Sequence, residues 1–213
     1  MPVGAPAEGF ASRIERSVAS FGLSRLQPEV FARLLAYCNL VVTWNQRVDL
    51  TAARDADELV DLLLADALAM TAARPASATE RWFDVGSGVG APGIPLALLG
   101  PMKMTLLEPR SKRVAFLRTA VGSLGRADIL VSRSRSDDFP DASCDVAVAR
   151  ATLPPAEWLT EGTRLATQSI WLLLAKAPLP ELGQHEILTD TSYRWPLTGV
   201  DRRAVCLSTG ARA

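Results

Sequence analysis

The sequence predicts an α/β fold in which a seven-stranded, mostly parallel Rossmann-like sheet follows a helical N-terminal region. Before residue 74, apolar residues recur at three- and four-residue steps, which is typical of helices. After residue 80, short apolar runs alternate with helical segments, as in parallel sheets. With 213 residues and 48% hydrophobic content, the chain can bury one full core with a small appended element. We therefore predict a helical region over residues 1–75 and an α/β domain over 76–213.

The N-terminal region shows three helical segments with explicit breaks between them. The first begins at Phe10, and the break at residues 22–28 precedes the second. A polar connector at 48–55 precedes the third, and residues 73–80, rich in Ala, Pro, Ser and Thr, form a hinge into the next domain. The apolar positions of the second and third helices are Val30, Phe31, Leu34, Leu35, Cys38, Val41 and Val42, then Leu59, Leu62, Leu63 and Ala67.

The α/β domain predicts seven strands with helices between them. The strands are expected at 81–85, 102–107, 128–132, 144–149, 170–175, 193–197 and 204–208. One helix begins at Gly93, a second covers 111–124, and the third covers 155–165 after a Pro-Pro pair that suits a helix start. Ligands of such sheets bind outside the carboxyl ends of the strands. This places five residues around one crevice: Asp84, Gly86, Glu108, Arg135 and Arg150.

The segment Asp84-Val-Gly-Ser-Gly-Val-Gly-Ala-Pro-Gly93 is a glycine-rich turn between a strand and a helix. Side chains at Gly86, Gly88 or Gly90 would obstruct the tight reversal and a ligand that touches the main chain. Glu108 ends the next apolar run, where a carboxylate can accept both ribose hydroxyls of an adenosine. The spacing also fits the dinucleotide fingerprint, so this pattern alone leaves two cofactors open.

The charges around the turn favour S-adenosyl-L-methionine over a dinucleotide. Asp84 stands at the strand end, where it attracts an ammonium or sulfonium group and repels a pyrophosphate. No Arg or Lys lies between Asp84 and Gly100, and the chain is too short for the separate substrate domain of a dehydrogenase. A glycine turn without any ligand would require the strand, the helix and the distant acid to coincide by chance.

The composition excludes several other classes. Lys and Arg number 23 and so do Asp and Glu, which removes a global argument for nucleic-acid binding but leaves room for a local patch. Cys38, Cys144 and Cys206 are far apart and His185 is the single histidine, so we expect buried cysteines and no metal. No apolar run reaches the roughly 18 residues of a membrane span, and no signal peptide is evident. We expect a soluble, cytoplasmic protein without a membrane partner.

The sequence carries a set of specific motifs: Trp44-Asn-Gln-Arg-Val-Asp-Leu-Thr-Ala-Ala-Arg-Asp55, the glycine loop with its Pro-Gly-Ile-Pro ending, residues 107–117, Ser134-Arg135 and Ala149-Arg150-Ala151. Together these motifs resemble the small-subunit ribosomal RNA methyltransferase G family, also called glucose-inhibited division protein B. The resemblance covers roughly residues 30–176. It implies a class I methyltransferase domain that transfers a methyl group from S-adenosyl-L-methionine to N7 of a guanine in small-subunit ribosomal RNA. Because guanine N7 carries an in-plane lone pair and no proton, this reaction needs alignment rather than a general base.

The resemblance also implies roles for individual residues. Arg150 and Lys176 are the expected catalytic residues, Arg150 between cofactor and target base and Lys176 on a phosphate. The expected cofactor-binding residues are Asp84, Gly86, Gly88, Gly90, Ala91, Glu108, Arg135, Ser136, Asp137 and Arg150, with Gly86 and Ala91 on the methionine side and Ser136 and Asp137 on the adenine. The expected RNA contacts are Arg47, Arg54, Lys112 and Arg113. The alternatives are solvated helix-start charges for Lys112 and Arg113, ion pairs with Asp49 or Asp55 for Arg47 and Arg54, and a core position for Trp44.

The substrate half departs from the family pattern. Leu62, Leu63 and Ala67 stand where the family has Arg, His and Ser, whereas Asp66 is retained. Ala177 replaces a glycine, Asp49 replaces an asparagine, and a late-strand lysine is absent near Ser208. Besides action on ribosomal RNA or the 30S subunit, these losses leave open a methyltransferase for a small-molecule metabolite, a non-catalytic cofactor-binding module and, more distantly, a dinucleotide oxidoreductase.

Overall fold

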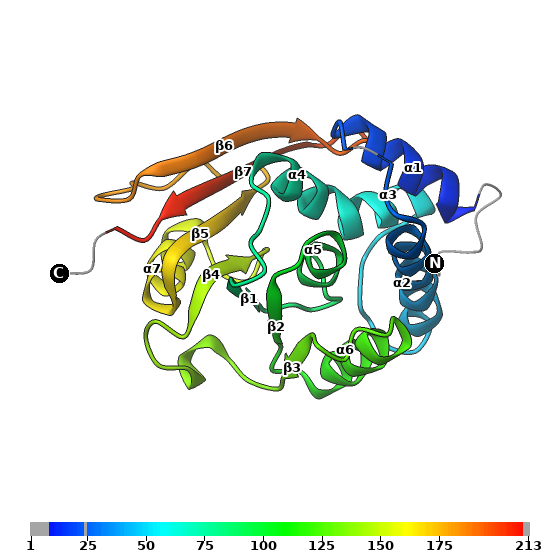
Figure 1. Cartoon of the computed structure of the whole chain (residues 1–213), viewed down its shortest axis with the longest axis horizontal. Coiled ribbons are helices and arrows are strands. Elements are labelled where there is room, and N and C mark those ends of the chain that lie inside the picture. The colour runs from blue at the N-terminus through cyan, green and yellow to red at the C-terminus, as the bar shows by residue number, and fades with distance from the viewer. Residues whose placement is uncertain (1–8, 24, 211–213) are drawn as a thin grey trace.

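The computed structural model describes residues 9–23 and 25–210. Two helices, α1 (Phe10–Ser20) and α2 (Pro28–Asn45), form one end of the molecule (Figure 1). A third helical stretch runs without a break through α3 (Ala56–Val60), a π-helical turn η1 (Asp61–Ala65) and α4 (Asp66–Ala73). The expected three N-terminal helices are confirmed, but the periodicity gave no sign of the π turn inside the third.

The remaining residues form one seven-stranded sheet in the order β3-β2-β1-β4-β5-β7-β6. The strands are β1 (Arg81–Val85), β2 (Lys103–Leu107), β3 (Leu130–Ser132), β4 (Cys144–Ala149), β5 (Ala166–Leu174), β6 (Ile187–Arg194) and β7 (Asp201–Ser208). The first five strands pair in parallel, whereas β7 is antiparallel to both β5 and β6. The connecting helices are α5 (Gly93–Leu99), α6 (Ser111–Ser123) and α7 (Pro155–Leu165). The predicted α/β class is confirmed.

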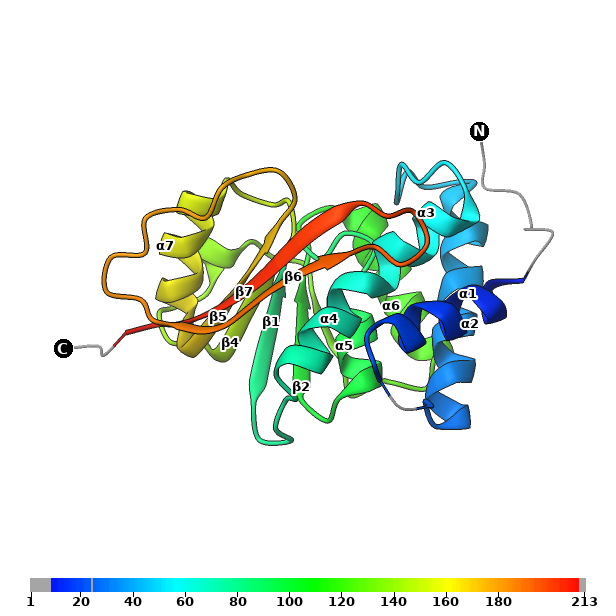
Figure 2. The same cartoon turned by 90° about the horizontal axis from the view of Figure 1, so that it is seen from above.

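Successive strand residues contribute to opposite faces of the sheet, which gives the molecule three layers. Trp82 belongs to the buried cluster that includes residues of α2, α4, α5 and α6. The next residue, Phe83, belongs to the cluster of α7 and meets Phe139 edge to face, with ring centroids 5.1 Å apart. Figures 1 and 2 show α7 apart from the other helices. Both faces of the sheet are therefore covered, as expected for parallel strands.

The N-terminal helices share the larger buried cluster with the sheet. Leu34, Tyr37 and Leu68 lie in the same cluster as strand residues such as Trp82. The expected hinge is held by polar contacts, because Arg74 pairs with Glu80, which also accepts from Trp82 Nε1 at 2.8 Å. Division of the chain at residues 75 and 76 therefore remains a prediction.

The sequence misplaced the sixth strand. We expected it at 193–197, but β6 ends at Arg194 and a turn follows. The reason is that β6 is an edge strand whose residues are exposed or half-exposed and largely polar, so it carries no apolar run. Strand β5 also begins four residues before the expected start at residue 170. Among the described residues, no helix is both long and apolar enough to span a membrane.

Candidate cofactor and substrate site

A cavity of about 1000 Å³ lies at the carboxyl ends of the central strands. One part of its wall, the loop half, includes Gly86, Gly88, Val89, Ala91, Glu108 and Arg135. The opposite part, the hairpin half, includes Leu62, Asp66, Arg150, Leu173, Trp195 and Arg202. The cavity therefore unites residues of the glycine loop with residues that are remote from it in sequence, and of the five residues expected around one crevice only Asp84 is outside the lining.

The glycine loop owes its shape to backbone conformations that favour glycine. Gly86, Gly88 and Gly90 have φ values of 71°, 58° and 90°. The N–H groups of Gly86 and Ser87 both donate to the carbonyl of Leu107, at 2.9 and 3.0 Å, which holds the loop over β2. Gly86 and Gly88 line the cavity, whereas Gly90 does not. A Cβ at Gly90 would lie 2.5 Å from Ile94 Cδ1, so this glycine serves core packing rather than ligand approach.

Glu108 is buried at the end of β2 and lines the cavity. Its Oε2 accepts from the N–H of Gly88 at 2.9 Å, and its Oε1 accepts from the N–H of Arg110 at 2.8 Å. Arg113 Nη1 lies 4.0 Å from Oε2. Each carboxylate oxygen keeps a further lone pair, so Glu108 is fixed in place and can still accept hydrogen bonds from hydroxyl groups.

Asp84 lies beneath the loop and not on the cavity wall. Its side chain is 1% exposed, and Oδ2 accepts from the N–H of Gly93 at 3.1 Å, which caps the first turn of α5. Burial raises the pKa of Asp84 to about 6, against the opposing effects of the Gly93 N–H and Arg150. We expected this carboxylate to meet a cationic ligand directly. This expectation was wrong, because the Asp84 carboxylate accepts the N–H of Gly93 at the start of α5 and does not reach the cavity. Asp84 can act on a ligand in the cavity only through its electric field.

Tyr37 of α2 supports the loop from the side of the N-terminal helices. Its hydroxyl donates to the carbonyl of Val89 at 2.8 Å, and the side chain is fully buried. Val89 lies between Gly88 and Gly90, so helix α2 directly holds the part of the loop whose backbone is flanked by two glycines. Sequence reasoning missed this contact. The available signal was a lone hydroxyl on an otherwise aliphatic helix face.

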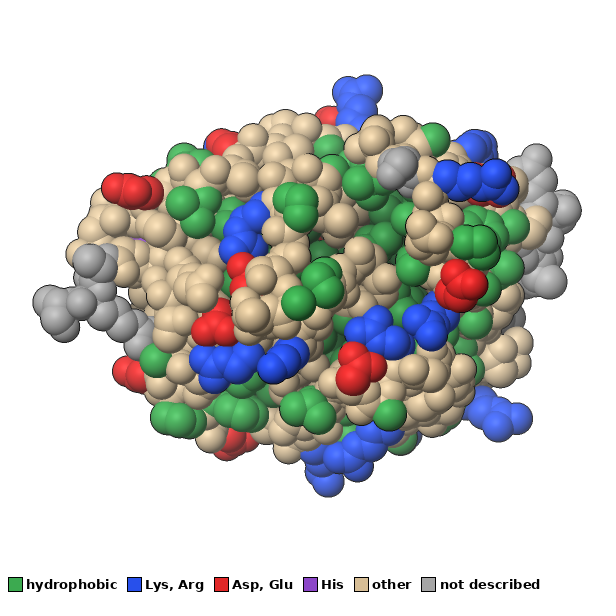
Figure 3. All heavy atoms as spheres, viewed as in Figure 1, with side chains coloured by type: hydrophobic (Ala, Val, Ile, Leu, Met, Phe, Trp, Pro, Cys, Tyr) green, Lys and Arg blue, Asp and Glu red, His purple; other side chains and the backbone are tan. Residues whose placement is uncertain are grey.

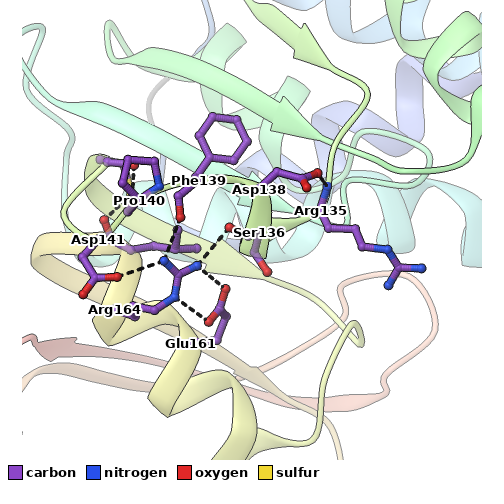
Figure 4. Close-up of polar contacts among 11 residues, drawn as sticks. Arg135, Ser136, Asp138, Phe139, Pro140, Asp141, Glu161 and Arg164 are labelled. Carbon is purple, nitrogen blue, oxygen red and sulfur yellow. Dashed lines mark hydrogen bonds and ion pairs between the residues drawn. The ribbon is translucent and has the colours of Figure 1, made fainter.

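The loop after β3 is anchored by Arg164 of α7 (Figure 4). Arg164 Nη2 donates to the carbonyl of Ser136 at 2.9 Å, and Nη1 donates to that of Phe139 at 2.8 Å. The hydrogen-bonded ion pair of Arg164 with Glu161, at 2.8 Å, raises the pKa of the guanidinium above its ordinary value. In Figure 4 the Arg135 side chain points away from this cluster, and it lines the cavity. Ser136 and Asp137 lie outside the lining, so their contact with an adenine stays a prediction.

The hairpin half is organised around Asp66, which is 2% exposed. Asp66 accepts from Tyr193 Oη at 2.6 Å and from Trp195 Nε1 at 3.4 Å, and it pairs with Arg150 Nη1 at 3.1 Å. The Arg202 guanidinium lies 4.0 Å over the Trp195 ring. Arg150 is in the cavity wall, as predicted. Trp195 and Arg202 were missed as site residues because the misplaced sixth strand hid the turn between them.

The remaining basic candidates lie at or beyond the rim. Arg113 lines the cavity, whereas Lys112 is exposed outside it. Lys176 is exposed between Ala175 and Ala177, which both line the cavity. Figure 3 shows Lys and Arg side chains interspersed with Asp and Glu on the displayed face rather than merged into one basic field.

Leu50, Thr51 and Ala52 of the polar connector line the cavity, whereas the predicted RNA contacts Arg47 and Arg54 lie outside the lining. Arg47 is exposed, and in the described part of the chain it forms no ion pair with Asp49. Arg54 does form a surface ion pair, but with Glu58 at 3.0 Å rather than with Asp55. Asp55 instead caps α3 by accepting from the N–H of Glu58. The carboxylate of Asp55 is therefore used by the helix start.

Two structural expectations about single residue types are confirmed. Trp44 packs edge to face on Phe116, with centroids 5.7 Å apart, as part of the core margin. Cys38, Cys144 and Cys206 are buried free thiols. Within residues 9–23 and 25–210, no group of three or more His, Cys, Asp or Glu side chains is arranged to hold a metal ion.

The strand order, with antiparallel β7 between β5 and β6, and the cavity at the glycine loop define a class I methyltransferase fold. A solved structure of TYW2 from P. horikoshii in complex with MeSAdo superposes with a TM-score of 0.53 at 17% identity, covering 70% of this chain and 61% of that one, which supports the fold alone. Residues 31–196 match the family model GidB, described as rRNA small subunit methyltransferase G. The chain belongs to this family.

Curated relatives named ribosomal RNA small subunit methyltransferase G support the family assignment. The one from Neisseria meningitidis serogroup C is 32% identical over 203 residues, covering 92% of this chain and 97% of the relative. The Stenotrophomonas maltophilia relative is 35% identical over 193 residues, covering 89% and 86%. The Pseudomonas aeruginosa LESB58 relative is 39% identical over 143 residues, and this match spans 66% of the chain and 65% of the relative.

Proposed function

We propose that this protein is an S-adenosyl-L-methionine-dependent methyltransferase that modifies N7 of a guanine in small-subunit ribosomal RNA. The observation that carries the proposal is the union, in one cavity, of the glycine loop, the Glu108 carboxylate and the Arg150 guanidinium. The curated relatives are named ribosomal RNA small subunit methyltransferase G, which supports the substrate class of the proposal. A cytoplasmic location follows from the substrate and is part of the proposal.

The loop half fits the cofactor. Within the described structure, the N–H groups of Val89 and Ala91 have no hydrogen-bond partner, although both residues are nearly fully buried and line the cavity. Unpaired buried donors are costly and point to an acceptor that binds there. Glu108 would accept the ribose hydroxyls, and Arg135 lies on the same wall. A Cβ at Gly86 would clash with Thr152 Oγ1, so glycine is required where the loop leaves the strand end.

In the proposed methyl transfer, the protein has to align the cofactor with the target guanine. When bound, the cofactor supplies an electrophilic methyl group. Guanine N7 needs no deprotonation, so we assign Arg150 to orient the base and Lys176 to contact a phosphate near the rim. Arg110, Arg113 and Arg135 line the cavity and supply further positive charge for an RNA backbone.

One observation favours a small-molecule acceptor as the second candidate. The hairpin half is largely apolar at Leu62, Leu173 and Leu174 and ends on the Trp195 ring, a lining typical of small-ligand pockets. A non-catalytic module is disfavoured, because the cavity beside the glycine loop is open rather than filled by side chains.

The decisive experiment offers the purified protein labelled S-adenosyl-L-methionine together with undermethylated 30S subunits, free small-subunit RNA or a metabolite extract. Label in the RNA, at N7 of guanine on nuclease digestion, supports the proposal, and RNA binding should weaken steeply with salt. Label only in the extract favours the second candidate.

A pair of Glu→Gln variants tests the cofactor site, with Glu108→Gln inside the cavity and Glu157→Gln outside it. Glu108→Gln should weaken cofactor binding, whereas Glu157→Gln, an exposed change on α7, should not. Absence of label in every acceptor would refute the proposed RNA substrate.

A further inference from the structure

Two buried carboxylates of one helix face the β6–β7 hairpin. Asp61 is fully buried and accepts from the N–H groups of Leu197 and Thr198, at 3.1 and 2.8 Å, and from Thr198 Oγ1 at 2.8 Å. Asp66 accepts from Tyr193 and Trp195 of the same hairpin. Figure 2 shows the hairpin running across the molecule to α3, next to this helix. The two carboxylates therefore clamp the hairpin at two points.

The π turn explains how residues five apart reach the same partner. In an α-helix, five residues correspond to a rotation of about 500°, which leaves the two side chains about 140° apart. A π turn closes i→i+5 hydrogen bonds, so its wider turn brings such residues closer to one face of the helix than an α-helix would. The π turn covers Asp61–Ala65, so Asp66 follows directly at the i+5 position. With this turn in place, Asp66 lines the cavity while Asp61 holds the hairpin tip.

Asp66 also holds Arg150 from the other side. Arg150 Nη1 donates to Asp66 Oδ2 at 3.1 Å and to the carbonyl of Leu62, on the preceding turn of the same helix. In the part of the chain that the structure describes, these are the hydrogen bonds of the Arg150 guanidinium, which is 21% exposed and faces the cavity. Both fixed points of Arg150 therefore belong to the π segment and its first following residue.

We propose that Asp66 is the positioning residue of the reaction, which fixes the Arg150 guanidinium opposite the glycine loop. The inference rests on the proposed function. Two consequences follow from the geometry. The pair removes the rotational freedom of a long side chain before the target base arrives. It also balances the positive charge of Arg150 beside a cationic sulfonium and a base that becomes cationic on methylation, which an unpaired guanidinium would repel.

The test compares two isosteric variants on the same helix. Asp66→Asn keeps the volume and an oxygen for the hairpin but removes the charge that holds Arg150. We expect kcat for methyl transfer to undermethylated 30S subunits to fall about 10- to 100-fold, while the Kd for S-adenosylhomocysteine, measured by calorimetry, changes by less than about twofold. Asp61→Asn, which weakens the hold on the hairpin tip but does not contact Arg150, is the matched comparison and should lower kcat much less than Asp66→Asn.

A double-mutant cycle separates positioning from a structural role. In an Arg150→Met background, Asp66→Asn should cost no further kcat, because its effect acts through the missing guanidinium. Equal losses of kcat in Asp66→Asn and Asp61→Asn, or additive losses with Arg150→Met, would overturn the inference while the activity of the native protein stands. No transfer by the native protein would overturn the proposed function and this inference with it.

Discussion

The buried carboxyl of Asp84 predicts a variant that gains stability and loses cofactor affinity. Burial raises the pKa of Asp84 from an ordinary 3.8 to about 6, which means that the folded protein disfavours the ionised form. A difference of roughly two pKa units corresponds to about 3 kcal/mol. The stability contributed by the protonated carboxyl is fully present below pH 3.8 and is lost as the pH rises through about 6. Above that pH, the native protein carries the whole cost of a buried charge.

Asp84→Asn removes this cost and keeps an oxygen for the Gly93 N–H. The variant without cofactor should be more stable than the native protein by about 3 kcal/mol at pH 7.5, or roughly 6–12 °C in Tm for a domain of this size. The difference should shrink toward zero near pH 4. The affinity for S-adenosyl-L-methionine should fall, because the electric field that favours a cation at the strand end is gone.

Thermal unfolding from pH 4 to 8 and calorimetric titration of the cofactor measure both effects. Asp145→Asn is the control of opposite sign, because hydrogen bonds from Arg81 hold the pKa of Asp145 below its usual range. That variant should lose stability above pH 4. If Asp84→Asn were less stable than the native protein at pH 7.5, or if its advantage did not vary with pH, the assignment of a strained, cation-attracting carboxylate would be wrong.

Two further predictions concern the support of the glycine loop. Tyr37→Phe leaves the Val89 carbonyl buried without its donor, so it should lower the free energy of unfolding by about 1–3 kcal/mol and raise the cofactor Kd. Thr209→Val removes the hydrogen bond of a remote buried hydroxyl and should leave the cofactor Kd unchanged. Equal Kd values in both variants would count against a role for α2 in the site. Gly90→Ala combines a φ of 90° with a Cβ placed 2.5 Å from another side chain, so urea unfolding should show a loss of about 1–3 kcal/mol. Gly122→Ala in α6, where a Cβ would meet nothing within 4 Å, should instead stabilise by about 0.5–1 kcal/mol, and similar effects of both alanines would refute the steric argument.

Much of the fold was predictable because local signals and tertiary needs agreed. The bounds of β1, β4 and α7 match the expected ranges, since these elements combine apolar runs with clear breaks or a proline start. Strand β6 was misplaced because an edge strand takes its pairing from β7 rather than from burial. The π turn was invisible because its side chains are apolar on all sides, apart from Asp61.

The candidate site was predictable where its residues follow directly on the carboxyl ends of the parallel strands. Gly86, Gly88, Glu108 and Arg150 all line the cavity, as expected from strand ends. Asp84 was expected on the cavity wall but lies beneath the glycine loop, because its carboxylate accepts the N–H of Gly93, a need that the sequence does not show. Trp195 and Arg202 depend on a hairpin that folds back from the far edge of the sheet, and no local pattern encodes that return.

The clamp between the π turn and the hairpin joins segments that are 127 to 137 residues apart in the chain. Closing so long a loop costs conformational entropy that nearby contacts do not repay, so such pairings form after the local ones. The glycine loop and Glu108, only 20 residues apart, can find each other early. The loop half of the cavity therefore includes a contact of short sequence separation, whereas the hairpin half is held by contacts between residues 127 to 137 positions apart.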